Sequence, residues 1–72
     1  MKIIRNAGDL GAEIRARRKA LGYTQAFFAE YAGISASFLS DLENGKETVQ
    51  INKLMRVVSL LGMDLYVTAR GE

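Results

Sequence analysis

Residues 24–44 read TQAFFAEYAGISASFLSDLEN, and the spacing of small and apolar residues in this stretch decides the fold. Ala29 lies where two helices would cross most closely, so a larger side chain there would push them apart. Gly33 ends an apolar-periodic run at a sharp turn, where glycine adopts a left-handed conformation at little steric cost. Leu39 and Leu42 follow at helical spacing and direct the next helix inward. This pattern predicts a helix-turn-helix, the arrangement whose second helix enters the DNA major groove.

The flanking residues predict two further helices. The first begins near Asp9 as its N-cap and ends at Leu21, before Gly22; the other runs from about Gln50 to Leu61. The expected buried residues are Leu10, Ile14 and Leu21 in the first helix, Phe27, Phe28 and Tyr31 in the second, and Ile51, Leu54, Met55, Val58 and Leu61 in the last.

After Gly62 the sequence changes from helical to alternating periodicity, which predicts a strand at about residues 63–69. A lone strand leaves its backbone N–H and C=O groups unpaired, so it needs a partner. Residues 2–5 of the same chain are one candidate, and the same strand of a second copy is the other. Because a two-stranded sheet is marginal, we favour a dimer that combines both ends of both chains. The residues expected at its interface are Met63, Leu65, Tyr66 and Val67.

The composition narrows the class of protein. The 72 residues contain no proline and no linker, which predicts a single domain over residues 1–72 whose small core makes dimerisation useful. They contain no cysteine and no histidine, so we expect no enzyme, no metal site and no cofactor. No apolar stretch approaches the roughly 20 residues needed to span a bilayer, and no long signal region begins the chain. We therefore expect a cytoplasmic protein without a membrane partner.

Basic residues are concentrated near the N-terminus. The net charge is only +2, yet residues 1–22 hold six basic residues and two acidic ones. Arg15 and Arg18 are predicted to face away from the core and to contact DNA phosphates. The alternative for this charge run is a solvated helix face without a ligand.

The ends of the predicted turn hold further candidate phosphate contacts. Thr24 is expected to cap its helix, and Gln25 can offer its side-chain amide to a phosphate at the positive helix end. Asn44 and Lys46 lie just past the following helix, where they would meet the DNA backbone.

The helix at about residues 35–44 is expected to be capped by Ser35 and is predicted to read bases. Its small first turn would sit deep in the groove, where serine pairs with several bases and alanine contacts a thymine methyl. Asp41 would be repelled by phosphates, although it could accept a hydrogen bond from cytosine N4 or orient an arginine. Phe38 is left open between a base contact and the core. The candidate base-reading residues are Ser35, Ala36, Ser37, Ser40 and Asp41.

Residues 24–46 contain the motif T-Q-x-x-x-A-x-x-x-G-I-S-x-S-x-L-S-x-L-E-N-G-K, which resembles the helix-turn-helix of the XRE family of lambda-type phage repressors and Cro. The resemblance extends over about residues 10–62. It implies a mostly α, four-to-five-helix, lambda-repressor-like DNA-binding domain, and a homodimeric repressor on a palindromic operator near its own promoter. The continuation G-K-E-T-V-Q-I-x-K-L is similar to HipB-like antitoxins. That similarity implies a C-terminal strand that completes the dimer and a HipA-like kinase toxin as a partner.

The first turn of the recognition helix departs from this family, because Ala36 and Ser37 stand where many members have glutamine, lysine or arginine. Specificity would then rest on the N-terminal arm, on Arg15, Arg17 or Arg18, or on DNA shape. Three functions follow as hypotheses. They are a dimeric autorepressor, an antitoxin that chiefly restrains a kinase toxin, and a protein-interaction adaptor that does not touch DNA.

Overall fold

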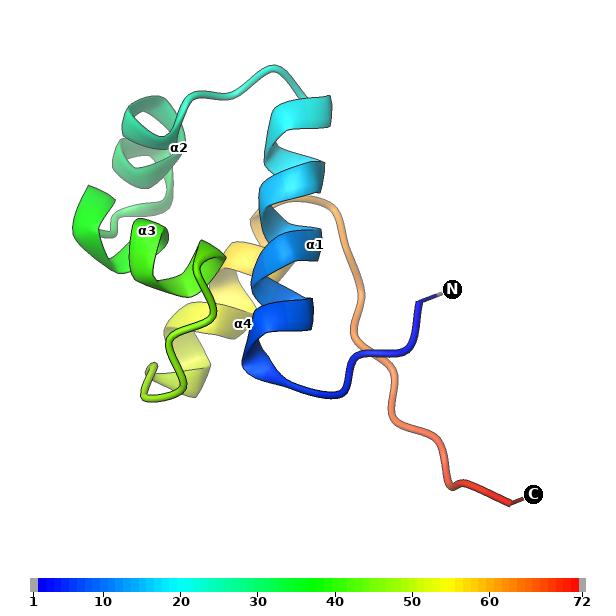
Figure 1. The fold of residues 1–72 in the computed structure, drawn as a ribbon. Coiled ribbons are helices and arrows are strands. Elements are labelled where there is room, and N and C mark those ends of the chain that lie inside the picture. Colours follow the sequence, from blue (N-terminus) through cyan, green and yellow to red (C-terminus); the bar gives the residue numbers. More distant parts are fainter. Residues whose placement is uncertain (1, 72) are drawn as a thin grey trace.

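The computed structural model describes residues 2–71 and contains four helices (Figure 1). They are α1 (Ala7–Ala20), α2 (Gln25–Ala32), α3 (Ala36–Glu43) and α4 (Ile51–Leu60). The mostly helical class and the helix-turn-helix, formed by α2 and α3, are confirmed. Within residues 2–71 no helix combines the length and the apolar character that a membrane span requires.

Helix α1 begins earlier than predicted. Its N-cap is Asn6, whose side-chain oxygen accepts a hydrogen bond from the backbone N–H of Asp9 at 2.8 Å. The prediction that Asp9 is the cap is therefore wrong. Asparagine caps a helix as well as aspartate does, and capping at Asn6 lengthens the helix by most of a turn. The carboxylate of Asp9 instead accepts from the backbone N–H of Arg5 at 3.1 Å, which holds the preceding chain against the helix.

The turn between α2 and α3 has the predicted construction. Thr24 and Ser35 cap the two helices, and their hydroxyls accept from backbone N–H groups at 3.1 and 2.9 Å. Gly33 has φ of 72°, in the left-handed region where a side chain is unfavourable. Ala29 is 2% exposed, as expected for a residue in the tightest part of the core. These features fix the angle at which α3 leaves α2.

One continuous core joins the four helices. Its buried apolar residues are Ile14, Phe28, Ala29, Ala32, Leu39, Leu42, Leu54, Val57, Val58 and Leu61. The predicted apolar face of α4 is wrong at Ile51 and Met55, which are 60% and 47% exposed. The buried stripe is formed by Leu54, Val57, Val58 and Leu61, so Ile51 lies at its margin and Met55 lies beyond it. Leu21, also expected to be buried, is the C-cap of α1 and remains partly exposed.

The aromatic residues of α2 divide between two faces. Phe28 is fully buried, as predicted. Phe27 and Tyr31 are 55% and 61% exposed, so their expected place in the core is wrong. Being four residues apart, they share the outer face of α2, where their rings stack with centroids 6.4 Å apart.

Two glycines bring the C-terminal end of α3 directly onto α1. A Cβ atom at Gly11 would lie 2.3 Å from the carbonyl oxygen of Leu42, so no other residue fits without a shift of backbone. Gly45 has φ of 83°, and a Cβ there would lie 2.7 Å from the Cα of Gly8. Helix α3 is thus positioned by contact of backbone with backbone. This contact was not predicted from the sequence.

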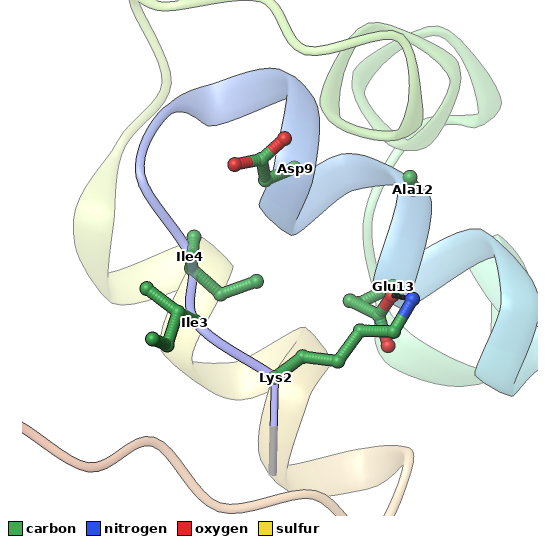
Figure 2. A pocket seen from close by; sticks show the side chains of 6 residues that line it. All are labelled: Lys2, Ile3, Ile4, Asp9, Ala12 and Glu13. Carbon is green, nitrogen blue, oxygen red and sulfur yellow. Dashed lines mark ion pairs between the residues drawn. The ribbon is translucent and has the colours of Figure 1, made fainter.

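The two terminal segments lie on the other side of α1 from α2 and α3 (Figure 1). Residues 63–69 have no regular secondary structure, so the predicted strand is not formed in the single chain. Its pairing in a dimer stays a prediction. The N-terminal arm, residues 2–5, runs back along α1, where Lys2 reaches Glu13 with Nζ and Oε2 3.1 Å apart (Figure 2).

Candidate nucleic-acid interface

The first turn of α3 has the exposure that base reading requires. Ser35, Ala36 and Ser37 are all exposed, and Ser40 and Asp41 one turn later are half-buried. Small side chains in the first turn leave the helix end narrow enough to enter a groove. Phe38 is half-buried and packs against the core, with Lys53 Nζ 5.4 Å from its ring centre. The structure therefore favours the core role of Phe38.

At the C-terminal end of α3, four predicted DNA contacts are paired with one another. The Nζ of Lys46 lies 3.4 Å from Asp41 Oδ2, and both side chains are partly exposed. The side-chain amide of Asn44 donates to the Ser40 hydroxyl at 3.4 Å. All four residues face solvent at least in part, so each pair is open to exchange for a ligand.

Arg18 does not belong to this surface, which corrects its predicted contact with phosphate. It is 5% exposed, and its Nε and one terminal N–H donate to the two carboxylate oxygens of Glu43 at 2.6 and 2.9 Å. Its other terminal nitrogen donates to the carbonyl of Tyr23 at 2.7 Å. Because Arg18 lies four residues after Ile14, it shares the inner face of α1.

Glu43 joins three helices through this ion pair and one further hydrogen bond. Besides binding Arg18 of α1, its Oε1 accepts from the side-chain amide of Gln25 on α2 at 3.0 Å. Burial raises the pKa of Glu43, but the hydrogen bonds from Arg18 and Gln25 outweigh it, so the pKa lies below its ordinary value. The same hydrogen bond raises the pKa of Arg18. The pair therefore stays ionised and holds the N-terminus of α2 beside the end of α3.

The role of Glu43 was not predicted from the sequence, although its position in the helix carries a signal. Glu43 lies four residues after Leu39, on the buried face of its helix. A carboxylate at such a position requires a buried cation, and the arginines of α1 were the available partners.

Gln25 and Thr24 remain placed as predicted at the N-terminus of α2. Gln25 uses one amide N–H for Glu43, which leaves its second N–H and its oxygen for another partner. The buried carboxylate therefore orients this amide in the free protein. Contact of Gln25 or Thr24 with phosphate stays a prediction.

Among the neighbouring arginines, Arg15 is the one that the geometry leaves available. Arg17 donates from Nε to the carbonyl of Leu61 at 2.8 Å, which caps the end of α4. Arg15 is exposed and lies one turn after Gly11, whose backbone meets the end of α3. The predicted use of Arg17 for specificity stays a prediction. The N-terminal arm is held on the far side of α1, and its use for specificity likewise stays a prediction.

Comparison with known proteins identifies the family. A helix-turn-helix family model matches residues 14–67. The chain belongs to this helix-turn-helix family. The regulator is 39% identical over 71 residues to the uncharacterized HTH-type transcriptional regulator y4mF of Sinorhizobium fredii, covering 99% of this chain and 93% of the relative. It is 38% identical over 63 residues to the ImmF control region 10 kDa protein of Bacillus phage phi105, covering 88% and 70%.

Solved structures agree with this assignment at the level of the fold. The chain in the HipB-O4 20mer complex superposes on this helix-turn-helix regulator with a TM-score of 0.86 at 18% identity, covering 97% and 99% of the two chains. A chain in the HipA-HipB-O2-O3 complex gives a TM-score of 0.87 at 18% identity, with the same coverage. The predicted resemblance is confirmed. The chain belongs to a family of transcriptional regulators, which also confirms the prediction that the protein is not an enzyme.

Proposed function

We propose that this regulator is a homodimeric repressor that reads a palindromic operator near its own promoter through α3. The observation that carries the proposal is the network around Glu43, which fixes α3 against α1 and α2 by a buried ion pair. A rigidly held helix whose first turn is small and exposed is suited to enter a groove, since base reading depends on exact placement.

Phosphate contacts surround that first turn in the proposal. The N-terminus of α2 offers a positive helix end to a phosphate, and the loop after α3 offers a lysine. The proposed phosphate contacts are Thr24, Gln25, Asn44, Lys46 and Arg15, without Arg18. The proposed base contacts are Ser35, Ala36, Ser37 and Ser40, whereas Asp41, the fifth predicted contact, is paired with Lys46.

Dimerisation is proposed through the terminal segments. The arm and residues 63–68 line a groove of about 890 Å³, in which Leu65 and Tyr66 are 42% and 71% exposed. Val67 is fully exposed, and the extended backbone around it lacks a sheet partner within residues 2–71. Residues 63–69, the C-terminal tail, of a second copy would cover these apolar side chains and would supply the missing backbone hydrogen bonds. Two α3 helices about 34 Å apart would then meet successive turns of the groove.

The proposal is tested by gel shift on DNA from upstream of the gene at about 50 and 200 mM salt, a range in which several phosphate contacts cost orders of magnitude in affinity. We expect specific, salt-sensitive binding by a dimer. Arg15→Gln should weaken it and reduce the salt slope by about 0.9 per protomer. Arg5→Gln removes the same charge from the exposed arm and should leave binding unchanged, provided that light scattering shows the variant to be a dimer, because Arg5 lines the proposed dimer groove. Binding no better than to unrelated DNA would defeat the proposal and favour an adaptor role.

An antitoxin role is the second candidate. It is favoured by the fold shared with HipB, one of whose solved structures is a complex named for HipA and HipB. A HipA-like kinase toxin would be the partner, and DNA binding would serve autoregulation. Co-expression with any kinase-like product of a neighbouring gene tests this role. Co-purification and loss of kinase toxicity would support it, whereas independent elution and undiminished toxicity would count against it.

A further inference from the structure

We infer that Asp41 is a specificity-determining residue that limits DNA affinity by holding Lys46, rather than a residue that reads a base. This inference rests on the proposed function, because it concerns how strongly the same surface binds DNA. Its consequence is that the recognition helix carries a built-in restraint on non-specific binding.

The pair is part of the way in which the loop after α3 is built. Lys46 Nζ lies 3.4 Å from Asp41 Oδ2, and the backbone N–H of Lys46 donates to the carbonyl of Asp41 at 2.9 Å. Between them Gly45 is fixed by its left-handed φ and its approach to Gly8. The backbone that carries Lys46 is therefore tied to Asp41 independently of the ion pair. This tie keeps the two side chains within reach of each other.

The charges of the recognition segment cancel when they are counted by exposure. Residues 35–46 contain three charged side chains, Asp41, Glu43 and Lys46. Glu43 is buried and neutralised by Arg18. The exposed charges are then Asp41 and Lys46, whose side chains are 46% and 54% exposed. The segment that enters the groove thus presents no net exposed charge, and a phosphate must compete with a carboxylate for its lysine.

Competition between Asp41 and phosphate for Lys46 weakens non-specific DNA binding more than operator binding. Non-specific binding is supplied almost entirely by cations at phosphates, so a neutralised lysine weakens it most. Operator binding also draws on base contacts, which the pair does not touch. Asp41 therefore lowers affinity for all DNA while widening the difference between operator and other sequences.

The test is a set of four variants in salt-dependent binding to the upstream fragment and to a scrambled fragment. Asp41→Asn should tighten binding to both, several-fold for the scrambled DNA, and steepen the salt slope by about 0.9 per protomer. The ratio of the two affinities should fall. Glu47→Gln is the matched control, because Glu47 is exposed and forms no ion pair within residues 2–71. In a Lys46→Gln background, the effect of Asp41→Asn should largely disappear.

Two results would overturn the inference while leaving the proposed function intact. Selective loss of operator binding in Asp41→Asn would show that Asp41 accepts a hydrogen bond from a base. Equal tightening with and without Lys46 would show direct repulsion of DNA by Asp41. Wild-type protein that binds no DNA would defeat the proposed function and this inference together. Thermal unfolding of each variant checks that the fold is unchanged.

Discussion

The junction of α1 with the end of α3 and the terminal segments lie on opposite sides of one helix, and they are built in opposite ways. At the junction, glycines allow backbone to meet backbone, and a buried carboxylate has its hydrogen bonds satisfied. Around the terminal segments, apolar side chains remain exposed and extended backbone lacks a sheet partner within residues 2–71.

This difference separates what one chain completes from what it leaves for a partner. The junction places the surface proposed to bind DNA, and it does so without help from a second copy. The terminal segments do not position the surface proposed to bind DNA. They instead present the alternating apolar pattern that a second copy could cover. Changes at the junction should therefore damage the fold, and changes in the tail should damage association.

The largest expected effect is at Glu43. Glu43→Ala leaves the Arg18 guanidinium buried without its carboxylate and should cost about 3–5 kcal/mol of unfolding free energy. Urea denaturation measures it, and Glu47→Ala on the exposed loop provides a control expected to change stability by less than about 0.5 kcal/mol. A loss at Glu43 no larger than at Glu47 would mean that the junction is not held by this ion pair.

Gly11 should show the next largest effect, with a sign opposite to that usual in helices. Replacing an interior glycine by alanine commonly stabilises a helix by about 1 kcal/mol. At Gly11 the new Cβ would meet the carbonyl oxygen of Leu42, so we expect Gly11→Ala to destabilise by about 2–3 kcal/mol. Ala12→Gly, next to it on the exposed face, measures the propensity of α1 alone. A stabilised Gly11→Ala protein would rule out the close approach of α1 and α3.

A smaller effect should appear with pH. The pKa of Glu43 is lower in the folded than in the unfolded protein, so the unfolded state binds more protons as pH falls. The stabilisation is complete above the ordinary value of about 4.5 and is lost as pH falls through the lowered pKa. The difference in Tm between wild type and Glu43→Gln should thus narrow from pH 7 to pH 3. A difference in Tm that stays constant from pH 7 to pH 3 would show that the charge of Glu43 does not contribute to the stability of the junction.

The parts of the fold that depend on near neighbours in the chain were predictable. The caps at Thr24 and Ser35, the left-handed Gly33 and the bounds of α4 follow from residues within one turn. The Arg18–Glu43 pair was not predicted, because its partners are 25 residues apart and periodicity does not specify such contacts. Gly11 was missed for the same reason, since its role is set by a carbonyl on another helix. Thus the position of α3 was predicted, but not what holds it there.

The tail should show the smallest effect on the fold and a large one on association. Val67→Asp places a charge at a fully exposed position, so the unfolding free energy of the monomer should change by less than about 0.5 kcal/mol. If Val67 is covered by a second copy, the cost of burying that charge should prevent association. Light scattering should then show a monomer, and operator binding should be weaker. The Tm of the variant should also lose the dependence on concentration expected of a dimer. Thr48→Asp adds the same charge at an exposed position outside the groove and should stay dimeric. A Val67→Asp dimer would exclude the tail as the interface, and an unfolded variant would show that the tail already belongs to the fold of one chain.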